Sequence, residues 1–147
     1  MKIDLVLREA HAAEVALAAE LTRVRERHPA EHDVFHLATT LRSWCERHLE
    51  ALVAQGERYD ATLATPAERG GGEEEEEDPI ALLRDVRDVY LAAARASLAW
   101  TMLGQGAQAV TDAELLAVVD ACHPETIRTM KWAVQKVKDA APQALSS

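Results

Sequence analysis

A carboxylate and two histidines interrupt the apolar stripes in the first half of the sequence. Glu14 stands where the heptad pattern expects an apolar residue, and His11 precedes it by three residues, so the two side chains are neighbours on a helix. His48 falls on the stripe of the next predicted helix, three residues after Cys45. In a hairpin that turns near residues 28–31, positions whose numbers sum to about 59 lie at one level, which brings these four side chains together.

A carboxylate in an apolar interior needs a compensating partner, because an isolated buried charge is very costly. One solution is a divalent transition metal such as zinc or iron, held by His11, Glu14 and His48 with Asp88 of the third predicted helix. A second solution is a hydrogen-bonded network of His–Glu or Arg–Asp pairs without metal. In a third, the register is shifted and Glu14 lies at the edge of the bundle in water. Asp85 and Arg128 are further residues that this register brings to a similar height.

Other histidines, cysteines and tryptophans have simpler interpretations. His32 and His36 are four residues apart, a spacing that can hold a metal, but a solvent-facing position for His32 is the simpler expectation. His28 and His123 each precede a proline and are expected at helix ends. Cys122 is expected as a small buried residue. The tryptophans are expected as anchors of the core or of a dimer interface, namely Trp44, Trp100 and Trp132.

The elements that must position these residues are four amphipathic helices. Apolar residues recur at three- and four-residue spacing, which predicts helices over residues 3–27, 29–55 and 79–103. Thr111 and Glu114 form a capping-box pattern before a fourth element that ends near residue 140, before Pro142. His123-Pro124 predicts that this element is kinked or split there. We therefore predict a single all-α domain over residues 1–147, an antiparallel up-down four-helix bundle.

The segment from residue 60 to residue 78 lacks an apolar pattern. It contains three consecutive glycines and an acidic run, Glu73 to Asp78, which predict a disordered linker between the second and third helices. The formal net charge of −9 argues against nucleic acid or an anionic membrane surface as a partner. No apolar stretch approaches the ~20 residues of a membrane span, and two cysteines are too few for a disulfide framework. We expect a cytoplasmic protein.

The layout of four helices with an inward carboxylate and histidines resembles the ferritin-like and hemerythrin-like bundles. Ferritin-like di-iron proteins carry Glu-x-x-His on two helices, whereas here His11-x-x-Glu14 has the reverse order and Cys45-x-x-His48 occupies the second helix. Of the hemerythrin-like spacings, only His32 with His36 is present. The resemblance implies the bundle architecture and no catalytic role. The alanine- and arginine-rich usage also resembles that of bacterial helical-bundle proteins.

Two classes of function fit these observations. The first is a small bundle that holds a metal ion or small ligand at a polar interior site. The alternative is a non-catalytic interaction or homodimerisation module, in which polar core residues only fix the helix register. The sequence shows no glycine-rich phosphate loop, nucleophile elbow or Cys-x-x-Cys pair, so an enzyme is the less favoured class.

Overall fold

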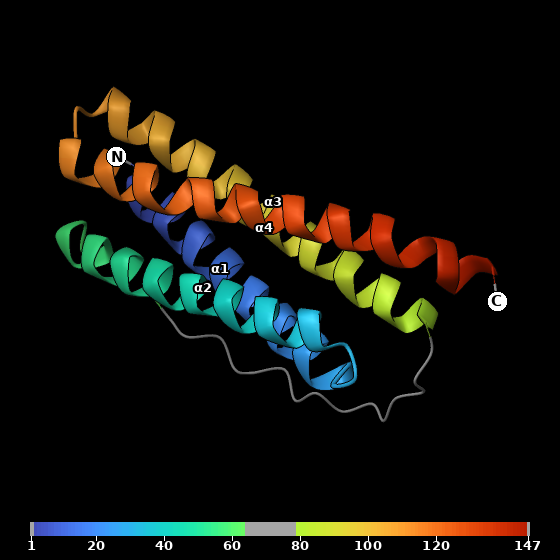
Figure 1. Cartoon of the computed structure of the whole chain (residues 1–147). Helices are drawn as coiled ribbons and strands as arrows, with labels where there is room; N and C mark the ends of the chain where they lie inside the picture. Colours follow the sequence, from blue (N-terminus) through green and yellow to red (C-terminus); the bar gives the residue numbers. More distant parts are fainter. Residues whose placement is uncertain (1, 64–78, 147) are drawn as a thin grey trace.

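The computed structural model describes residues 2–63 and 79–146, and in these ranges the chain forms helices and no strand. The four helices are α1 (Ile3–Arg27), α2 (His32–Arg58), α3 (Pro79–Ala109) and α4 (Ala113–Ser146), and they pack as a bundle (Figure 1). This confirms the predicted all-α four-helix architecture. No helix in the described ranges combines the length and apolarity needed to cross a membrane.

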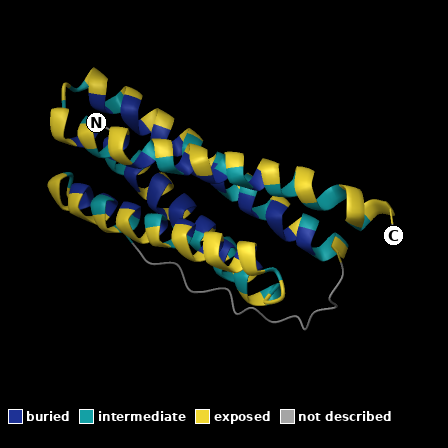
Figure 2. Cartoon of the chain, viewed as in Figure 1, coloured by how far each residue is buried: buried dark blue, intermediate teal, exposed yellow. Residues whose placement is uncertain are grey.

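Each helix buries one stripe and leaves the opposite face to solvent (Figure 2). In α1 the stripe recurs every three or four residues, as in Leu7, Leu17, Leu21 and Val24, which is the period that places side chains on one face of a helix. The apolar core is divided into two clusters, one toward each end of the bundle. Between them lie the buried polar side chains of Glu14 and His48.

The two core clusters define the direction of every helix. One cluster joins residues near the start of α1, such as Leu7, with residues near the end of α2 and α3, such as Leu52 and Leu103, and with the start of α4. Consequently α1 and α4 run in one direction, and α2 and α3 run in the other (Figure 1). All four pairs of helices that pack together are antiparallel. Helix α1 packs on α2 and on α3, and α4 packs on α3 and, least extensively, on α2.

This direction corrects the simple up-down order predicted from the sequence. In that order α3 would run antiparallel to α2, but the two helices are parallel and lie diagonally across the bundle. Arg58 and Pro79 therefore lie at opposite ends of the bundle. This order of directions is known from four-helix bundles with one long crossover.

Most of the predicted linker, residues 64–78, lies outside the described residues. Its first residues, 60–63, still belong to the bundle, because Asp60 adopts a left-handed conformation with φ 52° and the Ala61 N–H donates to the Gly56 carbonyl at 2.8 Å. This is a Schellman-type helix end. The helix predicted to end at residue 55 continues through Gly56, and α2 ends at Arg58.

The fourth element is one continuous helix, so the predicted split at His123-Pro124 is wrong, and no kink is shown there. Proline cannot donate to the carbonyl of Asp120, four residues earlier. Both Asp120 and Pro124 are exposed, so water can satisfy that carbonyl without a break in α4. The helix also continues past Pro142, which was predicted to stop it.

The corner between α3 and α4 also differs from the predicted capping box. Thr111 adopts a positive φ of 59°, and the carboxylate of Asp112 accepts the N–H of Leu115 at 3.1 Å, so Asp112 caps α4. Arg58 and Tyr59 at the end of α2 also bind this carboxylate. The pKa of Asp112 is lowered to about 2, mainly by the hydrogen bond from the Tyr59 hydroxyl and further by the Leu115 N–H and Arg58.

Two other helix limits move by a few residues. His32 begins α2, whereas the sequence placed the start at Pro29; His28 to Glu31 form the turn, with the Glu31 N–H bonded to the His28 carbonyl at 3.0 Å. At the end of α3, Gly104 and Gly106 do not terminate the helix. A Cβ at residue 106 would lie 2.8 Å from Cδ1 of Ile3, so this glycine permits close approach to α1.

Candidate functional site

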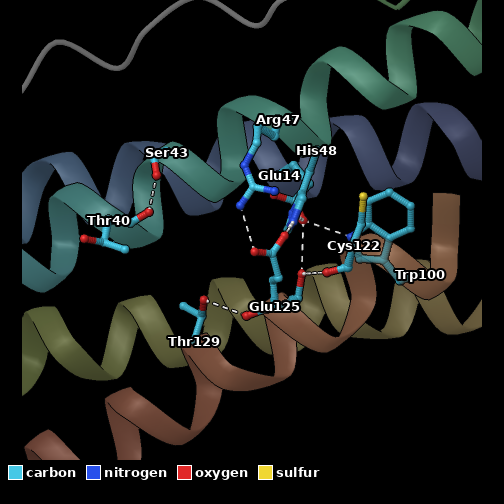
Figure 3. A network of polar contacts seen from close by, with 10 residues as sticks. Glu14, Thr40, Ser43, Arg47, His48, Trp100, Cys122, Glu125 and Thr129 are labelled. Carbon is cyan, nitrogen blue, oxygen red and sulfur yellow. Dashed lines mark hydrogen bonds and ion pairs between the residues drawn. The ribbon is translucent and has the colours of Figure 1, made fainter.

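A fully buried carboxylate lies at the centre of the bundle. Glu14 of α1 has no exposed surface, and its Oε1 atom accepts hydrogen bonds from all three other helices (Figure 3). His48 Nδ1 of α2 donates at 3.1 Å, Trp100 Nε1 of α3 at 2.9 Å, and Thr126 Oγ1 of α4 at 3.3 Å. One oxygen atom therefore joins the four helices at a single level.

His48 bridges this carboxylate to a second one. Its Nε2 atom lies 3.0 Å from Oε1 of Glu125 on α4, while Nδ1 faces Glu14. An ionised carboxylate only accepts hydrogen bonds, so a ring that donates to both carboxylates carries protons on both nitrogens, which is the imidazolium form. Burial acts to lower the pKa of His48, but Glu14 and then Glu125 outweigh it and raise that pKa above its ordinary value of 6.5.

The network ends at the protein surface. Arg47 Nη2 binds Oε2 of Glu125 at 2.8 Å, and the Arg47 side chain is largely exposed. Burial acts to raise the pKa of Glu125, but Arg47 and then His48 act in the opposite direction. The net result is a pKa below the ordinary value of a glutamate. Two carboxylates and two cations make the network neutral, the condition under which buried charges are tolerated.

Two buried cysteines lie in the field of the same carboxylate. Burial is the larger cause, and the charge of Glu14 the smaller, of a raised pKa at both thiols. The pKa of Cys45 lies above its ordinary value, and that of Cys122 is raised to about 12. Both cysteines are therefore neutral thiols at ordinary pH, and neither is an activated nucleophile. The second oxygen of Glu14, Oε2, is buried and has no hydrogen-bond partner among the described residues.

The structure brings together two of the four predicted metal ligands, Glu14 and His48. No hydrogen bond joins His11 to Glu14; the His11 ring lines a shallow groove between α1 and α2 with Leu49 and Val53, where burial lowers its pKa. Asp88 lies nearer the opposite end of α3 and pairs with its neighbour Arg87 at 3.0 Å. Within residues 2–63 and 79–146, no group of three or more His, Cys, Asp or Glu side chains has the geometry to hold a metal ion.

The other histidines also take structural positions. His28 ends α1 and contacts the buried carboxylate of Asp85 at 2.7 Å, and Arg27 reaches the same oxygen at 3.2 Å. His32, at the start of α2, is exposed, as is His36. His123 is not a helix cap: it lies inside α4 and contacts Ser97 Oγ at 2.9 Å.

Sequence reasoning missed four members of the network, namely Arg47, Trp100, Glu125 and Thr126. Trp100 was expected only as an apolar anchor, yet its fully buried indole needs an acceptor for Nε1–H, and that need was a usable signal. Glu125 and Thr126 directly follow Pro124, where a kink was expected. The continuous helix α4 instead directs both side chains toward Glu14 and His48.

Comparison with known proteins adds no family to this picture. No family model, no curated protein and no solved structure matches the chain. The resemblance to ferritin-like and hemerythrin-like proteins is therefore limited to the four-helix architecture.

Proposed function

We propose that this protein is a non-catalytic interaction module that forms a homodimer, and that its buried polar network fixes the register of the four helices. The network supports the structural part of this proposal. Both ring nitrogens of His48 face carboxylates, and Oε1 of Glu14 already accepts three hydrogen bonds. These atoms are occupied by the protein itself and are not directed toward a substrate.

Exposed leucines on the outer faces of the bundle carry the interaction part of the proposal. Leu98 is 62% exposed, Leu91 57% and Leu5 54%, which is unfavourable for a chain that stays monomeric. Covering such side chains with a second copy removes apolar area from water, at about 25 cal/mol per Å².

The test is the molar mass of the purified full chain in solution. Light scattering coupled to size-exclusion chromatography, over a hundredfold range of protein concentration, should give twice the chain mass of 16.1 kDa at the upper end. A mass of one chain throughout that range contradicts the homodimer.

A second candidate function, binding of a metal ion or small ligand in the polar interior, is favoured by one observation. Oε2 of Glu14 is buried without a partner and would be the protein's contribution to such a site. Metal analysis of the freshly purified protein, beside the His48→Ala variant, tests it. Stoichiometric zinc or iron that the variant loses supports the candidate. No metal, and no thermal shift on adding either ion, removes it.

A further inference from the structure

An exposed ion pair marks the outer seam between α1 and α3. Arg95 Nη2 of α3 lies 3.8 Å from Oε1 of Glu9 of α1, and both side chains are largely in solvent. Residues three or four positions away on a helix are neighbours on its surface. The neighbours of Glu9 on this face are Leu5 and Ala12, and those of Arg95 are Leu91 and Leu98, all of them exposed.

These residues form an exposed, largely apolar surface on α1 and α3, with the ion pair at its centre. Ala16 extends it along α1 and Met102 extends it along α3, and both are exposed. We call this set the α1/α3 patch: Leu5, Glu9, Ala12, Ala16, Leu91, Arg95, Leu98 and Met102. Its two charges cancel, so the patch itself adds no net charge to the repulsion between two chains that each carry −9.

We propose that the α1/α3 patch binds the same patch of a second copy of this chain, around a two-fold axis that runs parallel to the helices and between them. The inference rests on the proposed homodimer and deepens it by naming the surface. A two-fold interface must be self-complementary, because each copy presents the same residues. The α1/α3 patch satisfies this condition in charge and in side-chain size.

The charge argument follows from the antiparallel packing of α1 and α3. The proposed axis places α1 of each copy over α3 of the other, again antiparallel. Glu9 of each copy then lies over Arg95 of the other, so two ion pairs become a ring of four alternating charges. An axis across the helices would instead stack each helix on its own copy and bring like charges together.

The size argument uses the same placement. The first turns of α1 and the last turns of α3 share one end of the bundle. Leu5 of one copy therefore meets Leu98 and Met102 of the other. Leu91 of one copy meets Ala12 and Ala16 of the other, where small side chains leave room for a leucine and for close approach of the backbones.

Other exposed apolar residues make a poorer two-fold surface. On α2 the Phe35 ring is already covered by the guanidinium of Arg25, 5.8 Å from the ring centre. On α4 the exposed Ile127 and Val134 alternate with lysines, and Leu145 lies in the last turn of the helix.

The experiment measures the dimer dissociation constant of the full chain and of charge-reversed variants by analytical ultracentrifugation. Glu9→Arg and Arg95→Glu should each raise the constant about tenfold or more, because each places like charges together in the ring. The double variant restores alternation and should return it to within about threefold of the wild-type value. Leu98→Glu should raise it at least as much as a single reversal.

Matched controls lie outside the patch. Glu46→Arg reverses an exposed charge on α2, and Leu145→Glu replaces an exposed leucine on α4; both should leave the constant unchanged. Circular dichroism on every variant establishes that the helices are intact. A wild-type dimer that is insensitive to the reversals and to Leu98→Glu overturns this surface and leaves the homodimer standing. A wild-type monomer at every concentration overturns both.

Discussion

The Nδ1 atom of His48 lies 3.1 Å from Oε1 of Glu14, and this contact links α2 to α1 inside the core. The same carboxylate oxygen accepts from Trp100 on α3, so the pair also holds the second layer of the bundle. A change in register between any two of these helices would leave a buried charge unpaired, which is strongly unfavourable. The pair therefore contributes to the choice of one helix packing over its alternatives.

Replacing Glu14 tests this structural role. Glu14→Ala should lower the free energy of unfolding by about 3–5 kcal/mol, because it leaves the imidazolium of His48 and the indole N–H of Trp100 without their acceptor. Glu14→Gln should cost less, about 1–3 kcal/mol, since its carbonyl oxygen can still accept while the charge is lost. Urea unfolding at fixed protein concentration and neutral pH measures both.

The matched control is Glu46→Gln, an exposed glutamate on α2. It should change the unfolding free energy by no more than about 0.5 kcal/mol. If Glu14→Ala behaves like this control, the buried pair does not determine the stability of the bundle.

The first hairpin was largely predictable from the sequence, but the second half of the site was not. The connection between α1 and α2 is only four residues, so Glu14 and His48 had to come close once both were placed on inner stripes. The predicted register pairs Glu14 with Cys45, and Cys45 does interact with Glu14. His48, one helical turn further along α2, also reaches Glu14, whereas His11 lines the groove instead.

The direction of α3 could not be derived, because a long connection permits either direction with little difference in closure entropy. Assuming α3 parallel to α1 placed Asp88 at the level of Glu14. The actual direction places Trp100 there, and Asp85 faces His28 at the other end. One undetermined direction therefore accounts for the misplaced carboxylate and for part of the missed network.

The stability of the bundle should fall as the pH rises above about 6.5. The pKa of His48 is raised in the folded protein, so the folded state binds a proton more tightly than the unfolded state does. The resulting stabilisation is complete below the ordinary pKa of 6.5 and is lost as the pH rises through the folded value. Melting temperatures from pH 6 to pH 9 measure the loss.

The variant that isolates this effect is His48→Gln, which should flatten the dependence above pH 6.5 even though its overall stability is lower. His36→Gln, a change at an exposed histidine of the same helix, should keep it. The facing groups are Glu14 from α1, Glu125 from α4 and, in a T-shaped contact, the Trp100 ring from α3. An equally steep dependence in His48→Gln would falsify the assignment to this residue.

Relieving the strained backbone at Thr111 should stabilise the protein. A β-branched residue at a φ of 59° is unfavourable by about 1–2 kcal/mol relative to glycine. Thr111→Gly should therefore raise the unfolding free energy by about 1 kcal/mol, after allowance for the greater entropy of glycine in the unfolded chain. Thr111→Ala keeps a Cβ at the same φ and should gain much less. Equal gains from both variants would show that the strain lies elsewhere than in the backbone.

Proline inside the continuous helix α4 predicts a stabilising substitution. Pro124→Ala supplies the N–H that the Asp120 carbonyl lacks, and alanine is favoured over proline in a helix interior by about 3 kcal/mol. Proline also restricts the unfolded chain, which offsets about 1 kcal/mol of this gain, so the expected gain in the free energy of unfolding is about 2 kcal/mol.

Pro142→Ala is the matched control. Residue 142 lies in the final turns of α4, where fewer contacts depend on an intact hydrogen-bond ladder. The gain in this variant should therefore stay below about 0.5 kcal/mol. Urea unfolding of the three proteins at one concentration decides the matter: a loss of stability in Pro124→Ala would mean that the proline sets a bend on which the alignment of Glu125 with His48 depends.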